Sequence, residues 1–192
     1  MTTISTGNYT VGGVDLYFNA SIAPASLNAT TGGVTPGSTF RHAGNNLGNI
    51  ITSEIVPDVT YLEHYVAVNG KRKKDKVVVS MESITIPFTF DEMNEANIQK
   101  FFLASNLSGN KLAVLQEPLN EGSVSLHFRT NVGQDMVYSI PKAIIRPDGP
   151  LSIGNGEDWW SAPMVIEVLN YTGGQWASKP YGVLDTAPGG AS

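Results

Sequence analysis

Cysteine is absent from this chain of 192 residues, and histidine occurs only three times. A disulfide framework and a thiolate metal site are therefore both excluded, and His42, His64 and His127 are the available imidazoles. The first residues lack the charged and apolar regions of a signal peptide, and no apolar run approaches the roughly 18 residues of a membrane span. We expect a protein that is synthesised in the cytoplasm and does not enter a membrane.

Sequence patterns that indicate catalysis are also missing. Each histidine lies in a strand-like segment with no second histidine nearby, and the neighbours Glu63 and His64 would point to opposite faces of a strand. The glycines of Gly44–Gly48 lack the spacing of a phosphate-binding loop, and no helix follows them. We predict that the protein is not an enzyme and holds neither a cofactor nor a metal ion.

Basic residues are few and unevenly placed. Five of the 12 Lys and Arg residues lie in positions 71–76, and with Asp75 this segment carries +4. Since the whole chain carries −5, the remainder carries −9. Nucleic-acid affinity depends on cationic contacts with phosphate, so the acidic balance argues against DNA binding. It is compatible with a protein that DNA merely passes.

What the chain has in quantity is sequence that suits a β-rich domain. Its hydrophobic residues, 41% of the total, can supply the core of one domain, which we expect to span residues 1–192. The polar segment 20–38 is expected to form a long loop or arm, and residues 186–192 a flexible C-terminus. The predicted class is mainly β, or β-rich α+β, with strands at Tyr9–Asn19, Phe40–Ile55, Thr60–Val68, Lys76–Phe90, Val124–Phe128, Met136–Ile145 and Trp159–Tyr171.

A single helix is predicted at about residues 90–104. The sequence Thr89-Phe90-Asp91-Glu92 fits a capping box in which Thr89 is the N-cap and Glu92 reaches back to it. Met93, Ile98, Phe101 and Phe102 follow at roughly helical spacing and would form the apolar face.

The apolar pattern changes phase within the strand predicted at Lys76–Phe90. Val77, Val79 and Met81 alternate in one phase, whereas Ile84, Ile86, Phe88 and Phe90 alternate in the other. Side chains alternate strictly along a strand, so the change near Glu82 and Ser83 indicates a bulge, a crossing between two layers, or burial of both faces by assembly.

The segment Asn69–Lys76 is predicted to be a short basic loop between two long strands. Two interpretations stay open. It is either a solvated hairpin loop whose charges prevent edge pairing, or an ionic element that docks onto the acidic surface of another copy.

Two carboxylates, Glu157 and Asp158, precede Trp159 and Trp160. This combination is typical of sugar binding, because aromatic faces stack on sugar rings and carboxylates accept hydrogen bonds from hydroxyl groups. The interpretation that we favour is a loop entering a strand, with one tryptophan in the core and the other at an interface.

An ordered set of short patterns runs through residues 9–103. They are Tyr9-Thr10-x-Gly12, Asp15-Leu16-Tyr17-Phe18, Leu47-Gly48-Asn49, Glu63-His64-Tyr65, Gly70-x-Arg72-x-Lys74-Asp75 and Phe88-x-x-Asp91-Glu92 with Asn97 and Phe101-Phe102. A weaker similarity continues in Pro163–Leu169 and Pro180-Tyr181-Gly182. In this order and spacing the chain resembles the major tail tube protein of long, flexible, non-contractile bacteriophage tails.

The resemblance implies a tail-tube-like β-sandwich or barrel with one flanking α-helix. It also implies a virion protein whose six-membered rings stack into a tube, through which the genome leaves the virion. Partners would be further copies of the chain, the tape-measure protein, and the tail terminator and distal tail proteins, while DNA would pass without specific binding.

The resemblance also assigns roles to residues. The loop reaching the neighbouring ring would comprise Gly70, Lys71, Arg72, Lys73, Lys74, Asp75 and Lys76. Glu54, Glu63 and Glu82 are candidates for acids that face the lumen, where negative charge would keep DNA from binding. Two alternatives remain, a carbohydrate-binding β-sandwich module and the tube protein of a related secretion system.

Overall fold

The computed structural model describes residues 12–27, 45–107, 111–117, 119–130, 135–154, 156 and 158–186. The predictions made for Tyr9–Val11, for residues 28–44 and for residues 187–192 fall outside these ranges, as does Glu157.

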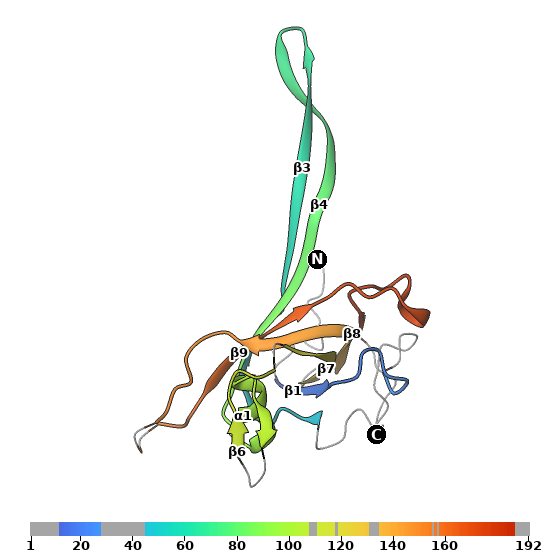
Figure 1. The fold of residues 1–192 in the computed structure, drawn as a ribbon. Coiled ribbons are helices and arrows are strands. Elements are labelled where there is room, and N and C mark those ends of the chain that lie inside the picture. Colours follow the sequence, from blue (N-terminus) through green and yellow to red (C-terminus); the bar gives the residue numbers. More distant parts are fainter. Residues whose placement is uncertain are drawn as a thin grey trace, which may run out of the picture.

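The described residues form a mainly β fold with a single α-helix, which confirms the predicted class (Figure 1). A sheet of eight strands has the order β1-β7-β8-β9-β4-β2, with β10 paired to β8 and β3 paired to β4, and β5 and β6 form a small separate hairpin. The elements are β1 (Gly12–Asn19), β2 (Ile50–Ser53), β3 (Val56–Val68), β4 (Lys71–Phe90), α1 (Glu95–Phe101), β5 (Ser105–Leu107), β6 (Lys111–Ala113), β7 (Asn120–Thr130), β8 (Met136–Pro147), β9 (Ala162–Val168), a 3-10 turn (Gly174–Trp176) and β10 (Val183–Asp185).

The sheet curls until its first and last strands nearly meet. Leu47, in the segment that leads into β2, donates its backbone N–H to Leu16 of β1 at 2.9 Å, and Tyr17 forms an isolated bridge with Asn46. These contacts bring the two ends of the strand order together, so that the sheet is a nearly closed, barrel-like layer. Such curling removes most of the free edge that an open sheet would expose.

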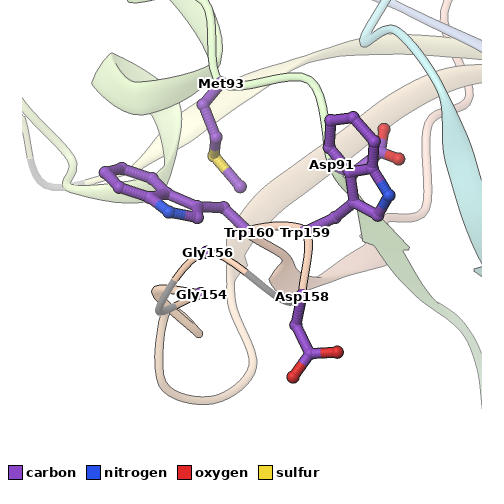
Figure 2. Close-up of a pocket in the computed structure, with 7 residues that line it drawn as sticks. All are labelled: Asp91, Met93, Gly154, Gly156, Asp158, Trp159 and Trp160. Carbon is purple, nitrogen blue, oxygen red and sulfur yellow. The ribbon is translucent and has the colours of Figure 1, made fainter.

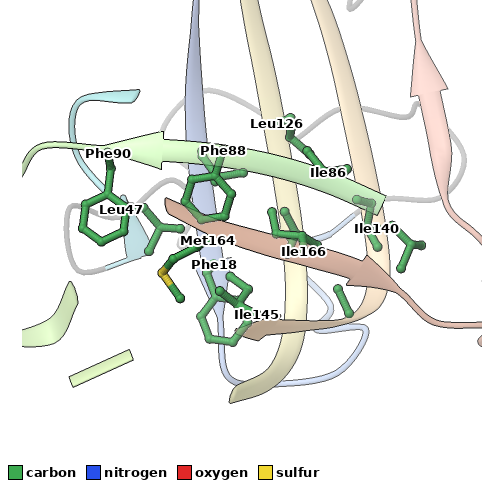
Figure 3. Packing of buried hydrophobic residues seen from close by; sticks show 14 of the residues in the cluster. Phe18, Leu47, Ile86, Phe88, Phe90, Leu126, Ile140, Ile145, Met164 and Ile166 are labelled. Carbon is green, nitrogen blue, oxygen red and sulfur yellow. The ribbon is translucent and has the colours of Figure 1, made fainter. Parts of the chain in front are cut away.

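The interior of the barrel is a continuous apolar core (Figure 3). Strand β4 supplies Ile86, Phe88 and Phe90, each no more than 2% exposed. Opposite them lie Leu126, Ile140, Ile145, Met164 and Ile166 from β7, β8 and β9. The alternation expected at Ile84–Phe90 therefore gives the inward face of β4 correctly.

The alternation of Val124, Leu126 and Phe128 with polar residues predicts that β7 is half-buried, and this is wrong. Val124 and Leu126 face the core, but Ser123, Ser125 and His127 on the opposite face are also buried.

A second apolar cluster, formed by Tyr17, Leu27 and Trp176, lies outside the main core. Tyr17 and Trp176 lie 159 positions apart in the chain, so local alternation could not predict the second cluster.

The C-terminal segment is tied to the barrel. The Tyr138 hydroxyl donates to the carbonyl of Tyr181 at 2.7 Å, and burial raises the pKa of Tyr138 to about 12. Strand β10 then pairs antiparallel with the first half of β8. Asp185, the last residue of β10, is thus part of the sheet.

The helix is shorter than predicted and begins later. Its N-cap is Asn94, whose side chain accepts the backbone N–H of Asn97 at 2.9 Å, so the capping box predicted at Thr89 is wrong. Thr89 and Phe90 instead pair with Pro163 and Ala162 of β9. Tertiary pairing of these residues prevails over the local capping signal.

Three other boundaries also differ from the prediction. Phe40–Ile55 is not one strand, because only Ile50–Ser53 pairs within the described part of that range. Pro57 does not separate two strands but lies inside β3, an edge strand in which a missing N–H is tolerated. Trp159 and Trp160 precede β9 rather than beginning it.

Strand β4 has a buried half and an exposed half, which a pair of truncations can separate. We expect Ile86→Ala to lower the free energy of unfolding by about 2–5 kcal/mol, because it leaves a cavity in the core. Met81→Ala, at a side chain 65% exposed, should change it by less than about 0.5 kcal/mol. Urea denaturation of both variants measures the difference, and equal losses would contradict this division of β4.

Candidate assembly surface

Strands β3 and β4 continue beyond the barrel as a long two-stranded arm (Figure 1). Ile84 pairs with Pro57 of β3 and Val168 of β9, and among the strands that the structure describes, residues of β4 before Ile84 pair only with β3. At 3.3 Å per residue the free part of β4 is about 40 Å long. The arm therefore projects well away from the core that holds the rest of the chain.

The turn at the arm's tip consists of Asn69 and Gly70 alone. Their φ angles are 52° and 75°, which suits the two-residue hairpin turn for which Asn-Gly is the preferred sequence. The basic loop predicted at Asn69–Lys76 is thus wrong in extent, because Lys71–Lys76 lie in β4. The charges stand on a regular strand instead of a loop.

Two bulges interrupt the pairing in the arm. Thr60 pairs with Met81 and Tyr61 with Val79, which leaves Ser80 as an extra residue. An extra residue exchanges the two faces of a strand, so Val77 and Val79 return to the same face as Ile84. Of the three explanations for the predicted phase change, a bulge is observed, but it lies at Ser80 instead of near Glu82 and Ser83. It accounts for Val77 and Val79, whereas Met81 stays on the face opposite Ile84.

The second bulge lies nearer the tip, at Asp75. His64 pairs with Lys76 and Tyr65 with Lys74, and the unpaired Asp75 places its carboxylate 2.6 Å from Nδ1 of His64. Glu63 and His64 point to opposite faces as expected, since Glu63 contacts Lys74 instead.

Glu63 organises one face of the arm near the tip. Its carboxylate accepts hydrogen bonds from Lys74 Nζ and from the Tyr65 hydroxyl, the latter at 2.5 Å. The bond from Lys74, and then that from Tyr65, lower the pKa of Glu63, while Glu63 in turn raises the pKa of Lys74. The guanidinium of Arg72 lies 5.3 Å from the centroid of the Tyr65 ring.

Three further lysines lie near the tip of the arm. Among the described residues, Lys71, Lys73 and Lys76 have no ion pair with a carboxylate. All three project from the face opposite Glu63, as their register with Val68, Val66 and His64 shows. This face therefore presents a strip of unpaired positive charge at the tip.

Apolar side chains are exposed on both faces of the arm. We call one the tyrosine face (Val59, Tyr61, Tyr65, Val77 and Val79) and the other the leucine face (Leu62, Val68, Val78 and Met81). Leu62 and Met81 are 63% and 65% exposed, and Tyr61 is 59% exposed. A lone two-stranded ribbon is marginally stable in water, and apolar surface of this extent is typical of an interaction site.

The three candidate lumen acids do not form a single cluster. Glu63 lies well along the arm and is paired with Lys74, whereas Glu82 lies at the arm's base opposite Val59. Glu54 lies on the barrel between β2 and β3, with its backbone N–H bonded to Pro87 O at 3.0 Å. Their orientation towards a lumen stays a prediction.

A pocket lies at the end of β4 remote from the tip (Figure 2). Its volume is about 570 Å³, and its lining consists of Asp91, Met93, Gly154, Gly156, Asp158, Trp159 and Trp160. In Figure 2 the two indoles extend to opposite sides of the Met93 side chain. We call it the tryptophan pocket.

Neither tryptophan of this pocket is in the core. Trp159 is 87% exposed and Trp160 is 43% exposed, so the expectation of one core tryptophan is wrong, and the buried indole is that of Trp176. The loop that carries the pair is held by close packing, since a Cβ at Gly154 would lie 1.9 Å from the carbonyl oxygen of Asp158. The exposed indoles and the Asp158 carboxylate also keep the predicted sugar-binding combination open.

No pattern in the sequence indicates that Asp91 and Met93 lie beside the two tryptophans. They come together because Phe90 pairs with Ala162, which places the exit from β4 beside the entry to β9. Asp91 accepts two hydrogen bonds of 2.9 Å from the Asn49 side chain, which fixes its carboxylate at the rim of the barrel. Only strand pairing over long sequence separation reveals the site.

Other kinds of site receive little support from the described part of the chain. It holds no group of three or more His, Asp or Glu side chains that could bind a metal ion. None of its helices has the length and hydropathy needed to span a membrane. His64 lies on the arm and His127 in β7, while His42 falls outside the described residues.

Comparison with known proteins adds no identity. No protein-family model matches the sequence, and the search of curated proteins finds no match. Function must therefore be inferred from the chain's own residues and geometry.

The ion pair in the arm should be visible in a titration. Lys74 lowers the pKa of Glu63 in the folded protein below the unfolded value of about 4.3. The ion pair therefore stabilises the arm at pH values above about 4.3, and this stabilisation is lost as the pH falls through the lower pKa of the folded state. Carboxyl-carbon NMR should give Glu63 a midpoint below about 4.3, and Lys74→Ala should raise it. An unchanged midpoint in Lys74→Ala would contradict the pairing.

Proposed function

We propose that this chain is the structural subunit of a bacteriophage tail tube, a virion protein whose rings stack head to tail. The observation that carries the proposal is the β3–β4 arm, which leaves the barrel with apolar side chains exposed on both faces. An isolated ribbon of this length gains little from its own contacts. Neighbouring subunits would cover both faces and so stabilise it.

The distribution of charge supports contact between identical copies. The segment 71–76 carries +4 and the remaining chain −9, so the tip of one copy is complementary to the bulk of the next. Complementary charge steers association and fixes its register. The same excess of negative charge would let DNA pass through a tube without stalling on its wall.

The geometry also suits a ring. Identical subunits close a ring through heterologous contacts, and a second heterologous contact continues the rings into a filament. The outer edge of β3 is free within the described residues and offers backbone groups to a neighbour. By the resemblance given above, rings of six and contacts with tape-measure, terminator and distal tail proteins belong to the same proposal.

Electron microscopy of the purified chain tests the proposal directly. We expect rings or tubes for the wild type, and none for a variant in which residues 58–83 are replaced by a two-residue Asn-Gly turn. Pro57 and Ile84 are already paired, so the barrel of this variant should fold, as circular dichroism would check. A wild type that stays monomeric, alone and with its tail partners, would sink the proposal.

Charge reversal at the tip distinguishes a docking arm from a solvated one. We expect Lys73→Glu to weaken stacking, since Lys73 forms no ion pair with any carboxylate that the structure describes, and wild-type stacking to weaken with added salt. Lys111→Glu makes the same change of charge on the small β5–β6 hairpin and serves as control. Tube length measured for both variants decides, and equal lengths would mean that the tip charge is merely solvated.

Two alternatives keep specific tests. A carbohydrate-binding module is favoured by the exposed indoles beside Asp158, and it predicts glycan-array signals that Trp159→Ala abolishes and Leu184→Ala leaves intact. Absence of any signal would remove this alternative. The tube protein of a related secretion system would share the assembly behaviour, and neighbouring genes for a secretion apparatus instead of capsid and tail genes would identify it.

A further inference from the structure

We propose that the tryptophan pocket is the receptor for the basic arm tip of a second copy of this chain. The proposal rests on the proposed self-assembly and deepens it by naming the two surfaces that meet. The tip carries Lys71, Lys73 and Lys76, which form no ion pair with a carboxylate among the described residues. The pocket presents exposed indoles together with the carboxylates of Asp91 and Asp158.

The two surfaces lie at opposite ends of one strand. Lys71 begins β4 at the tip, and Asp91 follows its last residue at the pocket. A strand of this length spans about 65 Å, and its extended backbone prevents the tip from folding back onto its own pocket. In Figure 1 the arm rises from one side of the barrel, whereas α1 and the β8–β9 connection lie at the other. The tip can therefore reach such a pocket only on another copy.

The chemistry of the two surfaces is complementary. Trp159 and Trp160 offer aromatic faces, which attract the ammonium group of a lysine, and tryptophan is the strongest such partner. Asp91 and Asp158 add carboxylates, and Met93 adds a flexible apolar surface for the methylene stem of the same side chain. The volume of about 570 Å³ admits several side chains and not the whole arm.

Contacts of this kind produce a directional assembly. A tip at one end and its receptor at the other form a heterologous pair, so each docked copy leaves one new tip and one new pocket free. The repeat continues without limit along the direction of β4. The exposed tyrosine and leucine faces of the arm would be covered on the way by the copies between which it passes.

Disulfide trapping tests the contact on the full chain, which has no cysteine of its own. Val68→Cys places a thiol beside the tip, and Ile153→Cys places one in the pocket loop next to Gly154, at side chains 37% and 65% exposed. Neither change removes a tip cation or a pocket residue. Under mild oxidation the double variant should form covalent ladders of many copies, as non-reducing electrophoresis measures.

The matched control combines Val68→Cys with Leu184→Cys, whose side chain is 50% exposed on β10 away from the pocket. We expect this control to give at most covalent dimers, formed by a disulfide between the thiols introduced by Val68→Cys in two copies. Equal ladders in both double variants would overturn the proposal, because they would show collision without a preferred site. Dimers alone in both would overturn it as well.

Substitutions in the pocket separate this proposal from the proposed function. Trp159→Ala with Asp158→Lys should raise the protein concentration needed for assembly by about tenfold or more, and Leu184→Ala should leave it unchanged. Both sites are exposed, so folding is preserved. The pocket variant retains an intact tip, and Lys73→Glu retains an intact pocket. A mixture of the two should therefore form heterodimers that grow no further, as analytical sedimentation would measure.

The outcomes are distinguishable. If the wild type assembles, the arm-deletion variant does not, and the pocket variant assembles at the wild-type concentration, then the tube proposal stands and the receptor proposal falls. If the wild type never assembles, both fall. If a glycan binds in the pocket and assembly is unchanged, the tip does not occupy the pocket, and the receptor proposal is overturned.

Discussion

The structure depends on one constraint, that β4 belongs at once to a buried sheet and to an unsupported ribbon. From Ile84 onwards it is flanked by other strands and its side chains Ile86, Phe88 and Phe90 fill the barrel. Before Ile84 it pairs with β3 and with no other strand among the described residues, and its side chains are exposed on both faces. The core thus anchors one end of the arm, and the direction of the arm is set by the part of β4 that lies in the barrel.

The polar contacts of the arm follow from this situation. Without a core, the strands are aligned by backbone pairing and by surface contacts, such as Glu63 with Lys74 and His64 with Asp75. Exposed pairs of this kind contribute little to stability. They do favour one register among several, which under the proposed self-assembly would set the position of the apolar faces against a neighbouring copy.

The sequence predicted much of the fold because alternation is a local property. The inward face of β4, the hairpin of β7 and β8 and the overall β class all follow from residues close in the chain. The predicted start of the helix was wrong because Thr89 and Phe90 pair with β9, about 70 positions later in the chain. No local sequence pattern indicates this pairing. The basic residues of the tip could be identified from the sequence. The tryptophan pocket could be identified only in part, through Trp159 and Trp160, because its other side depends on the same long-range pairing.

The two bulges have a consequence for how such an arm can change length. Adding one residue to each strand would exchange the tyrosine and leucine faces beyond the insertion, whereas adding two to each would preserve them and lengthen the arm by about 7 Å. A single extra residue in one strand is absorbed as a bulge, as at Ser80 and Asp75. Arm length in variants of this chain should therefore change in discrete steps, and if the proposed assembly holds, the spacing between successive copies would change in the same steps.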